Sequence, residues 1–150
     1  MTMYVANPSA LLLGASNTPG KTVVQLSAGS RPLRIKEIGA SFNGTDASLT
    51  PITVELCRYS GAGTATAGTT LEQTEIGAAS LATYNHTYTS EPSATEIIRR
   101  WYVTPAGGLF VMQFPLGEEP VVGPSGFIGL RCITGSGTTP YVSAYIVFDE

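Results

Sequence analysis

The sequence has 150 residues, which suits one domain with a single core. Only 13% of the residues are charged, whereas average soluble proteins carry about 25%. The formal net charge is −3 and the eight Lys and Arg residues are scattered, which argues against nucleic acid as a partner.

Other exclusions concern membranes and secretion. No apolar run reaches the roughly 20 residues that a membrane helix requires, so no membrane partner is expected. The first residues show neither the basic segment nor the long apolar stretch of a secretory signal, so synthesis in a cytosol is expected. With so few charges, much of the surface is expected to lie against other subunits.

Residues 1–20 contain an apolar cluster, Leu11, Leu12 and Leu13, between Pro8 and Pro19. This segment is interpreted as an N-terminal arm or a first strand. An arm would place the three leucines on a neighbouring subunit, which makes them candidate interface residues. Residues 21–150 are predicted to form a single β-sandwich domain.

Alternation of apolar and polar residues with period two predicts eight strands. They cover residues 21–26, 33–43, 52–59, 82–90, 95–104, 108–114, 127–134 and 141–148. Within 33–43 the apolar phase switches between Ile35 and Ile38, which predicts a bulge or bend. The last two strands are predicted to pair as a β-hairpin, because a Gly-rich loop joins them.

The predicted fold is therefore all-β, an antiparallel β-sandwich of about eight strands. The strand count favours a jelly roll, and an immunoglobulin-like sandwich or an irregular barrel remain alternatives. Residues 60–80, rich in Gly, Ala and Thr, lack the alternation of a strand. They are predicted to form a long contact loop, because loops of this length in compact domains are commonly functional.

No catalytic, cofactor or metal site is predicted. His86 is the single histidine, which excludes metal sites built on two imidazoles. No serine lies in a G-x-S-x-G turn, so a Ser-His-Asp triad is not indicated. Cys57 and Cys132 are predicted to point to opposite faces, which argues against a disulfide and for two reduced thiols.

One cluster stands out on the predicted strand 82–90. Tyr84, His86 and Tyr88 alternate along it and are expected to share one face, with Tyr102 as a possible fourth member. Such an aromatic stripe suits the centre of a protein interface or a platform for a sugar ring, and ordinary sheet packing is the remaining interpretation. As an interface it predicts a homo-oligomer, with a trimer as first choice.

The chain resembles the small β-sandwich structural proteins of tailed bacteriophages. The resemblance lies in the Lys-poor, Ala/Gly/Thr-rich composition, the opening Tyr4-Val-Ala-Asn-Pro8, and the closing segments 126–133 and 141–148. It implies a non-enzymatic virion protein of the capsid decoration or cement type, made in the host cytoplasm. The implied partners are the major capsid protein or other virion subunits. The alternative is a carbohydrate-binding or receptor-binding β-sandwich module of a phage tail or fibre.

Overall fold

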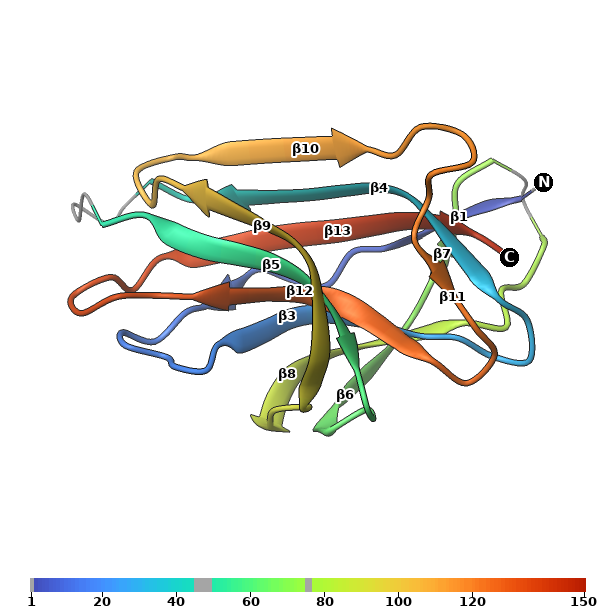
Figure 1. Ribbon diagram of the computed structural model, residues 1–150, viewed down its shortest axis with the longest axis horizontal. Helices are drawn as coiled ribbons and strands as arrows, with labels where there is room; N and C mark the ends of the chain where they lie inside the picture. The colour runs from blue at the N-terminus through green and yellow to red at the C-terminus, as the bar shows by residue number, and fades with distance from the viewer. Residues whose placement is uncertain (1, 45–49, 75–76) are drawn as a thin grey trace.

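A computed structural model describes residues 2–44, 50–74 and 77–150. Every regular element among these residues is a strand, and the strands form two antiparallel sheets that pack face to face (Figure 1). The prediction of an all-β sandwich is therefore confirmed.

The first sheet has its strands in the order β10 (Leu109–Gln113), β4 (Leu33–Phe42), β13 (Tyr141–Asp149), β1 (Met3–Ala6) and β7 (Leu71–Glu72). Two short strands join it: β11 (Val121–Val122) pairs with β4, and β2 (Leu11–Leu12) pairs with β13. The second sheet has the order β6 (Thr64–Thr69), β8 (Thr83–Ser90), β3 (Lys21–Ser27), β12 (Phe127–Ile133), β5 (Ile52–Tyr59) and β9 (Ala94–Val103).

The strand order is that of a jelly roll. Eight strands make up this framework: β1, β3, β4, β5, β9, β10, β12 and β13. If these eight strands are numbered 1 to 8 along the chain, one sheet has the order 1-8-3-6 (β1, β13, β4, β10). The other sheet has the order 2-7-4-5 (β3, β12, β5, β9). This arrangement of eight strands in two sheets is the jelly-roll pattern. Strands β6 and β8 come between the fourth and fifth framework strands and widen the second sheet.

The predicted hairpin of residues 127–134 and 141–148 is wrong, although both strands exist. Strand β12 pairs with β3 and β5, whereas β13 pairs with β1, β2 and β4 in the other sheet. The Gly-rich connection therefore crosses from one sheet to the other. The turn after β9 crosses likewise, because β10 pairs with β4. Alternation shows that one side of a strand is buried, but both sheets bury a side against the same core, so it does not reveal the partner.

Two further segments are settled by strand pairing. Within residues 60–80, β6 pairs with β8 and β7 pairs with β1, so the prediction of a loop throughout this stretch is wrong. Within residues 1–20, β1 pairs with β13, so this segment contains a first strand. Leu13 is fully buried in the core, Leu11 is half-buried against it, and Leu12 is exposed.

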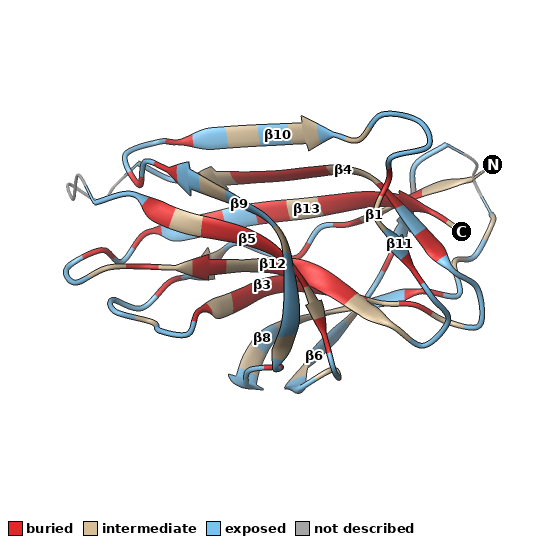
Figure 2. Ribbon diagram, in the orientation of Figure 1, coloured by how far each residue is buried: buried red, intermediate tan, exposed pale blue. Residues whose placement is uncertain are grey.

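The core lies between the two sheets. Ile38, Ile146 and Phe148 enter it from the first sheet, and Leu26, Leu56 and Leu130 from the second, all fully buried. Figure 2 shows the burial concentrated along β3, β4, β5, β12 and β13, whereas β6, β8 and β10 are mostly half-buried or exposed.

The bulge expected in residues 33–43 is confirmed. Val147 is opposite Glu37, but the next residue, Phe148, is opposite Ile35, so Lys36 is the additional residue in β4. The bulge lets both Ile35 and Ile38 enter the core. Lys36 then forms ion pairs with Glu119 and Asp149, at 2.8 and 3.1 Å.

Candidate functional site

The aromatic residues of β8 do not form one stripe. Tyr84 and His86 lie together, with ring centroids 5.7 Å apart, and Tyr84 packs against the core. Thr87 has a positive φ of 52°, and the pairing with β6 shifts register around it. Beyond this bulge, Tyr88 donates a hydrogen bond to Gln25, the residue that Asn85 also contacts. Tyr88 therefore lies on the opposite face of the sheet from Tyr84 and His86, so the same-face expectation is wrong.

Tyr102 is also separate from this group. It lies in β9, and β9 and β8 are separated by three strands in the second sheet. Its side chain is 72% exposed, opposite Thr53 on the outer face. Of the candidate interface residues, only Tyr102 and Leu12 are classed as exposed, and they belong to different sheets.

The outer face of the second sheet carries a buried carboxylate that the alternation pattern gave no reason to single out. Glu55 is fully buried between Arg131 of β12 and Arg100 of β9, its directly opposed neighbours. Arg131 Nε donates to Glu55 Oε2 at 2.6 Å, and Arg100 Nε donates to Oε1 at 2.8 Å. Burial alone would raise the pKa of Glu55, but the two guanidinium groups outweigh it and hold this pKa below its usual value.

Loops cover this face next to Glu55. Gln25 Nε2 donates to the Gly61 carbonyl at 3.0 Å, in the loop after β5. The Thr22 amide donates to Glu91 Oε2 at 2.8 Å, in the loop after β8. The carboxylate of Glu55 is paired on both oxygens and is therefore a structural anion, with no lone pair directed at an open site for acid–base work.

The thiols follow the predicted arrangement, since both cysteines are free. Cys132 packs in the core and Cys57 lies on the outer face of the second sheet, both buried. Burial raises the pKa of Cys57 to about 11 and raises that of Cys132 further. We expect a thiol reagent to count two thiols per chain in denaturant without reductant, but to label the folded protein slowly at pH 8. Rapid labelling of the native protein, or fewer than two thiols in denaturant, would contradict this arrangement.

Acid stability should depend on the carboxylates whose pKa the fold lowers, which are Glu119, Glu55 and Glu37. The hydrogen bond from Lys36 holds the pKa of Glu119 at about 2, and the pKa of Glu55 is also lowered. A carboxyl group with a lowered pKa in the fold stabilises the protein above its unfolded value, 4.5, and this contribution is lost as the pH falls toward the folded value. We expect the urea midpoint to fall between pH 4.5 and pH 2, and Glu119→Gln to reduce this dependence. A midpoint that is constant over this range would contradict the assignment.

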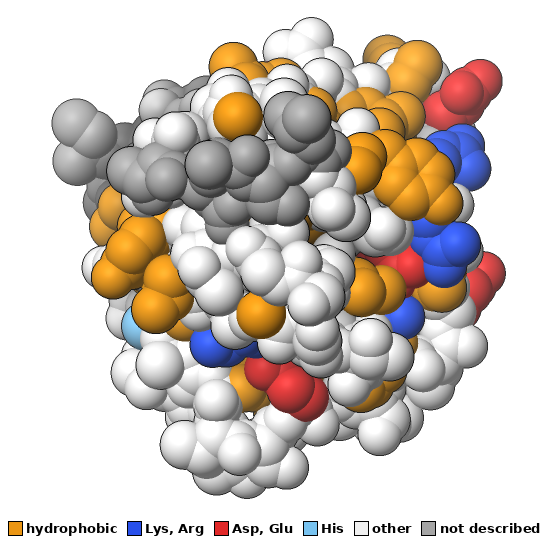
Figure 3. Space-filling model, turned by 90° about the vertical axis from the view of Figure 1, so that its left-hand side faces the viewer, with side chains coloured by type: hydrophobic (Ala, Val, Ile, Leu, Met, Phe, Trp, Pro, Cys, Tyr) orange, Lys and Arg blue, Asp and Glu red, His pale blue; other side chains and the backbone are white. Residues whose placement is uncertain are grey.

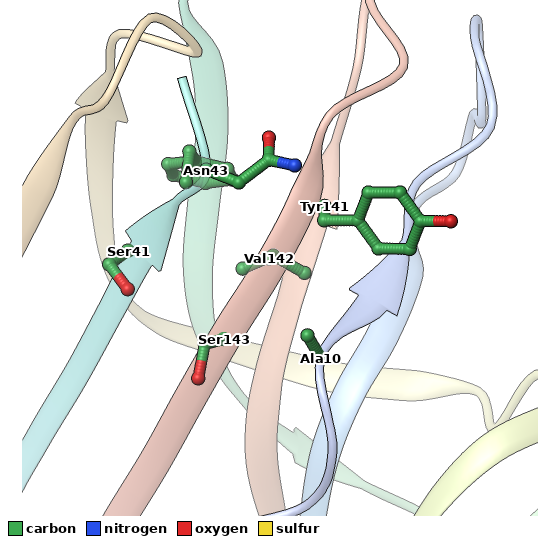
Figure 4. Close-up of a pocket in the computed structure, with 7 residues that line it drawn as sticks. Ala10, Ser41, Asn43, Tyr141, Val142 and Ser143 are labelled. Atoms are coloured by element: carbon green, nitrogen blue, oxygen red, sulfur yellow. The ribbon is translucent and has the colours of Figure 1, made fainter. Parts of the chain in front are cut away.

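A shallow hollow of about 100 Å³ lies at one end of the first sheet (Figure 4). Its polar lining comes from adjacent strands: Ser41 and Ser143 are directly opposed residues, and Asn43 follows β4. Tyr141, 47% exposed, and Ala10 complete its rim. In Figure 4 the two serine hydroxyl groups point the same way and the Asn43 amide points toward Tyr141. An aromatic ring beside hydroxyl and amide groups can bind a small neutral polyol.

A second hollow, of about 200 Å³, lies on the outer face of the first sheet. Lys36 and Glu37 line it, and both are already engaged: Lys36 with Glu119 and Asp149, and Glu37 with Tyr145 and Gln113. A ligand would have to displace these contacts, so this hollow is the weaker candidate.

Exposed large apolar side chains are most frequent along one edge of the sandwich, which is formed by β9 of the second sheet and by β10 and β11 of the first, and which we call the β9–β11 side. Those of β9 lie on the outer face of the second sheet, and those of β10 and β11 on the outer face of the first. Six of the ten belong to β9, β10, β11 and the loop between the last two: Ile97, Tyr102, Leu109, Val111, Leu116 and Val121. From Trp101 to Gly117 the sequence has no charged residue. Figure 3 views the molecule from the end where β9 and β10 meet: hydrophobic side chains appear there in several groups, and charged side chains lie at one edge and in the lower part of the view. Monomeric proteins rarely leave large apolar patches exposed.

Among the described residues, no three His, Cys, Asp or Glu side chains are grouped so that they could hold a metal ion. No helix in the same residues has the length and apolar character to cross a membrane. No protein-family model, curated protein or solved structure matches this chain. A functional proposal therefore rests on the hollows and the exposed apolar residues described above.

Proposed function

We propose that this protein is a non-enzymatic virion structural component that decorates a capsid and bridges neighbouring subunits. The observation that supports this role is the β9–β11 side, which holds six exposed apolar residues, four of them in the uncharged stretch from Trp101 to Gly117. Such a surface is stabilised by burial against other subunits. The jelly-roll fold, which viral capsid proteins commonly have, is compatible with the proposal but does not by itself indicate it.

The proposed mechanism is mass action. A protein that binds the assembled lattice, but not free capsid subunits, stabilises the shell by its binding free energy. The partners in this proposal are the major capsid protein or other virion subunits, together with further copies of the chain. The trimeric order predicted for the homo-oligomer depended on Tyr84, His86 and Tyr88 sharing a face, and the bulge at Thr87 divides them.

Binding to particles tests the proposal. Tagged protein, added to purified particles of the virus that encodes it, should co-sediment with them at a fixed ratio to the capsid subunit. Val121→Asp, on the β9–β11 side, should lower the bound amount at least tenfold. Leu81→Asp is the matched control, because Leu81 is equally exposed but lies before β8. Absence of the wild type from the particle fraction, or equal loss with both variants, would refute the proposed role.

The proposal includes the absence of hydrolase or transferase activity. His86 is half-buried, and its Nδ1 lies 3.0 Å from the hydroxyl group of the adjacent Thr87. We expect His86→Ala to leave the thermal midpoint and particle binding nearly unchanged, because surface substitutions usually cost less than about 0.5 kcal/mol. An enzymatic turnover that His86→Ala abolishes would overturn the non-enzymatic assignment.

A carbohydrate-binding or receptor-binding module of a phage tail or fibre is the second candidate, supported by the hollow at Tyr141. If this function is correct, neutral hexoses should shift the NMR signals of Ser41, Asn43 and Ser143, and Tyr141→Ala should abolish the shifts. Tyr102→Ala is the control, since Tyr102 is exposed on the other sheet. Unchanged spectra at 50 mM sugar (about five times a 10 mM Kd, a weak-binding limit) would exclude this candidate.

A further inference from the structure

We infer that β10 is a pairing edge, through which two copies of this chain join their first sheets across a two-fold axis. Strand β10 is the last strand on its side of the first sheet and pairs only with β4 in the described part of the chain. Alternate backbone N–H and C=O groups of β10 therefore point away from the sheet. An added antiparallel strand would satisfy them.

This edge lacks the features that usually protect edge strands. Natural edges carry charged residues, Pro or bulges that prevent pairing with another chain. The residues of β10, Leu109–Gln113, include no charge and no Pro, and they pair with β4 in five consecutive positions without a register shift. Strand β9, the corresponding edge of the second sheet, carries Glu96, Arg99 and Arg100 and two register shifts. Of the β9 and β10 edges, β10 is the one that combines regular geometry with exposed apolar side chains.

The side chains of β10 favour an added strand on both faces. Leu109 and Val111 point outward and are 68% and 52% exposed. Phe110 and Met112 point inward and are half-buried against the core. A further strand would cover the exposed part of all four residues, which contributes apolar burial in addition to backbone hydrogen bonds.

A second copy of the same chain is the partner that this edge fits. The uncharged stretch around β10 offers nothing to a charged peptide, whereas another β10 is equally uncharged and has the same length and twist. In an antiparallel pair with a two-fold axis perpendicular to the sheet, a residue is opposed by its own copy at the centre. With Val111 at this centre, Phe110 faces Met112 of the second copy, a favourable contact between sulfur and an aromatic ring.

The inference specifies the homo-oligomer within the proposed function, and its test does not use particles. A pair of five-residue strands is a small interface, so the dissociation constant should be on the order of micromolar. Analytical ultracentrifugation of the whole chain from 1 to 200 µM (from about such a constant to about 200-fold above it) should show a reversible dimer of the 15.7 kDa chain. Val111→Lys should weaken dimerisation at least tenfold.

Leu71→Lys is the matched control, because Leu71 is 60% exposed in β7, the opposite edge of the same sheet. A second variant, Val111→Cys, keeps the test decisive if Val111→Lys does not fold. Directly opposed residues in an antiparallel pair have Cα atoms about 4.5–5.5 Å apart, which permits a disulfide. Mild oxidation should therefore cross-link Val111→Cys into dimers, and Leu71→Cys should remain monomeric.

A monomer at every concentration, a trimer, or a dimer that Val111→Lys leaves intact would overturn the inference. Particle binding has a separate outcome. A dimer that does not bind particles would refute the decoration role but support the β10 pairing. A protein that binds particles but stays monomeric in solution would support the decoration role and refute the β10 pairing.

Discussion

Replacing Glu55 with alanine is expected to lower the free energy of unfolding by about 3–5 kcal/mol, the cost of leaving a buried charge without its partner. Glu55 is fully buried, and the Arg131 side chain is only 15% exposed. Without the carboxylate, the Arg131 guanidinium would stay near Cys57 and Tyr59 with no anion to neutralise it. Urea unfolding at pH 7, followed by far-UV circular dichroism, measures the change.

An exposed ion pair in the same sheet provides the control. Arg58 and Glu96 are 3.0 Å apart, with side chains 35% and 62% exposed. Glu96→Ala should change the free energy of unfolding by less than about 1 kcal/mol, because water screens exposed pairs. Similar losses for both variants would show that Glu55 is not the buried centre of this face. The double variant Glu55→Met with Arg131→Leu should recover much of the loss, since replacing a buried pair by apolar residues is often tolerated.

The eight predicted strands all exist, and most were predictable because one of their sides packs on the core. Ile52, Val54 and Leu56 alternate with Thr53, Glu55 and Cys57, and the first three do enter the core. The same pattern implied that Glu55 and Cys57 would face solvent. They are buried because the loops around Gly61 and Glu91, which bond to Gln25 and Thr22 of β3, fold over the outer face. Such coverage depends on tertiary contacts, which the periodicity of one strand does not report.

The two bulges also show what the periodicity of a strand can and cannot predict. The bulge at Lys36 was predictable, because apolar residues at Ile35 and Ile38 break the alternation. The bulge at Thr87 was not, because Tyr84, His86 and Tyr88 keep a perfect period of two across it. The prediction that these three residues form one interface was wrong because of this bulge. The apolar side chains of β10 were placed correctly in a strand, but their exposure follows from β10 being an edge, which only the sheet order reveals.

Gly129→Ala is the second substitution with a large expected effect. Gly129 lies in the middle of β12, directly opposite Gln25 of β3 and Cys57 of β5. A Cβ atom at this position would lie 2.3 Å from the carbonyl oxygen of Val24 and 2.7 Å from the Cα atom of Gln25. Both atoms belong to the backbone of β3, which β8 holds on its other side. The strands would have to separate, so we expect a loss of about 3 kcal/mol or more, at the upper end of overpacking costs.

Gly123→Ala separates this steric effect from the general effect of replacing glycine. Gly123 follows β11, and an added Cβ atom there meets no other atom within 4 Å. Its φ is not in the left-handed region, so alanine should be neutral or should stabilise the fold by up to about 1 kcal/mol through the unfolded chain. Thermal unfolding of the two variants should therefore give midpoints that differ by at least about 6 °C, given roughly 2–4 °C per kcal/mol for a chain of this size. Equal midpoints would mean that β12 and β3 do not approach each other as closely at Gly129 as this packing requires.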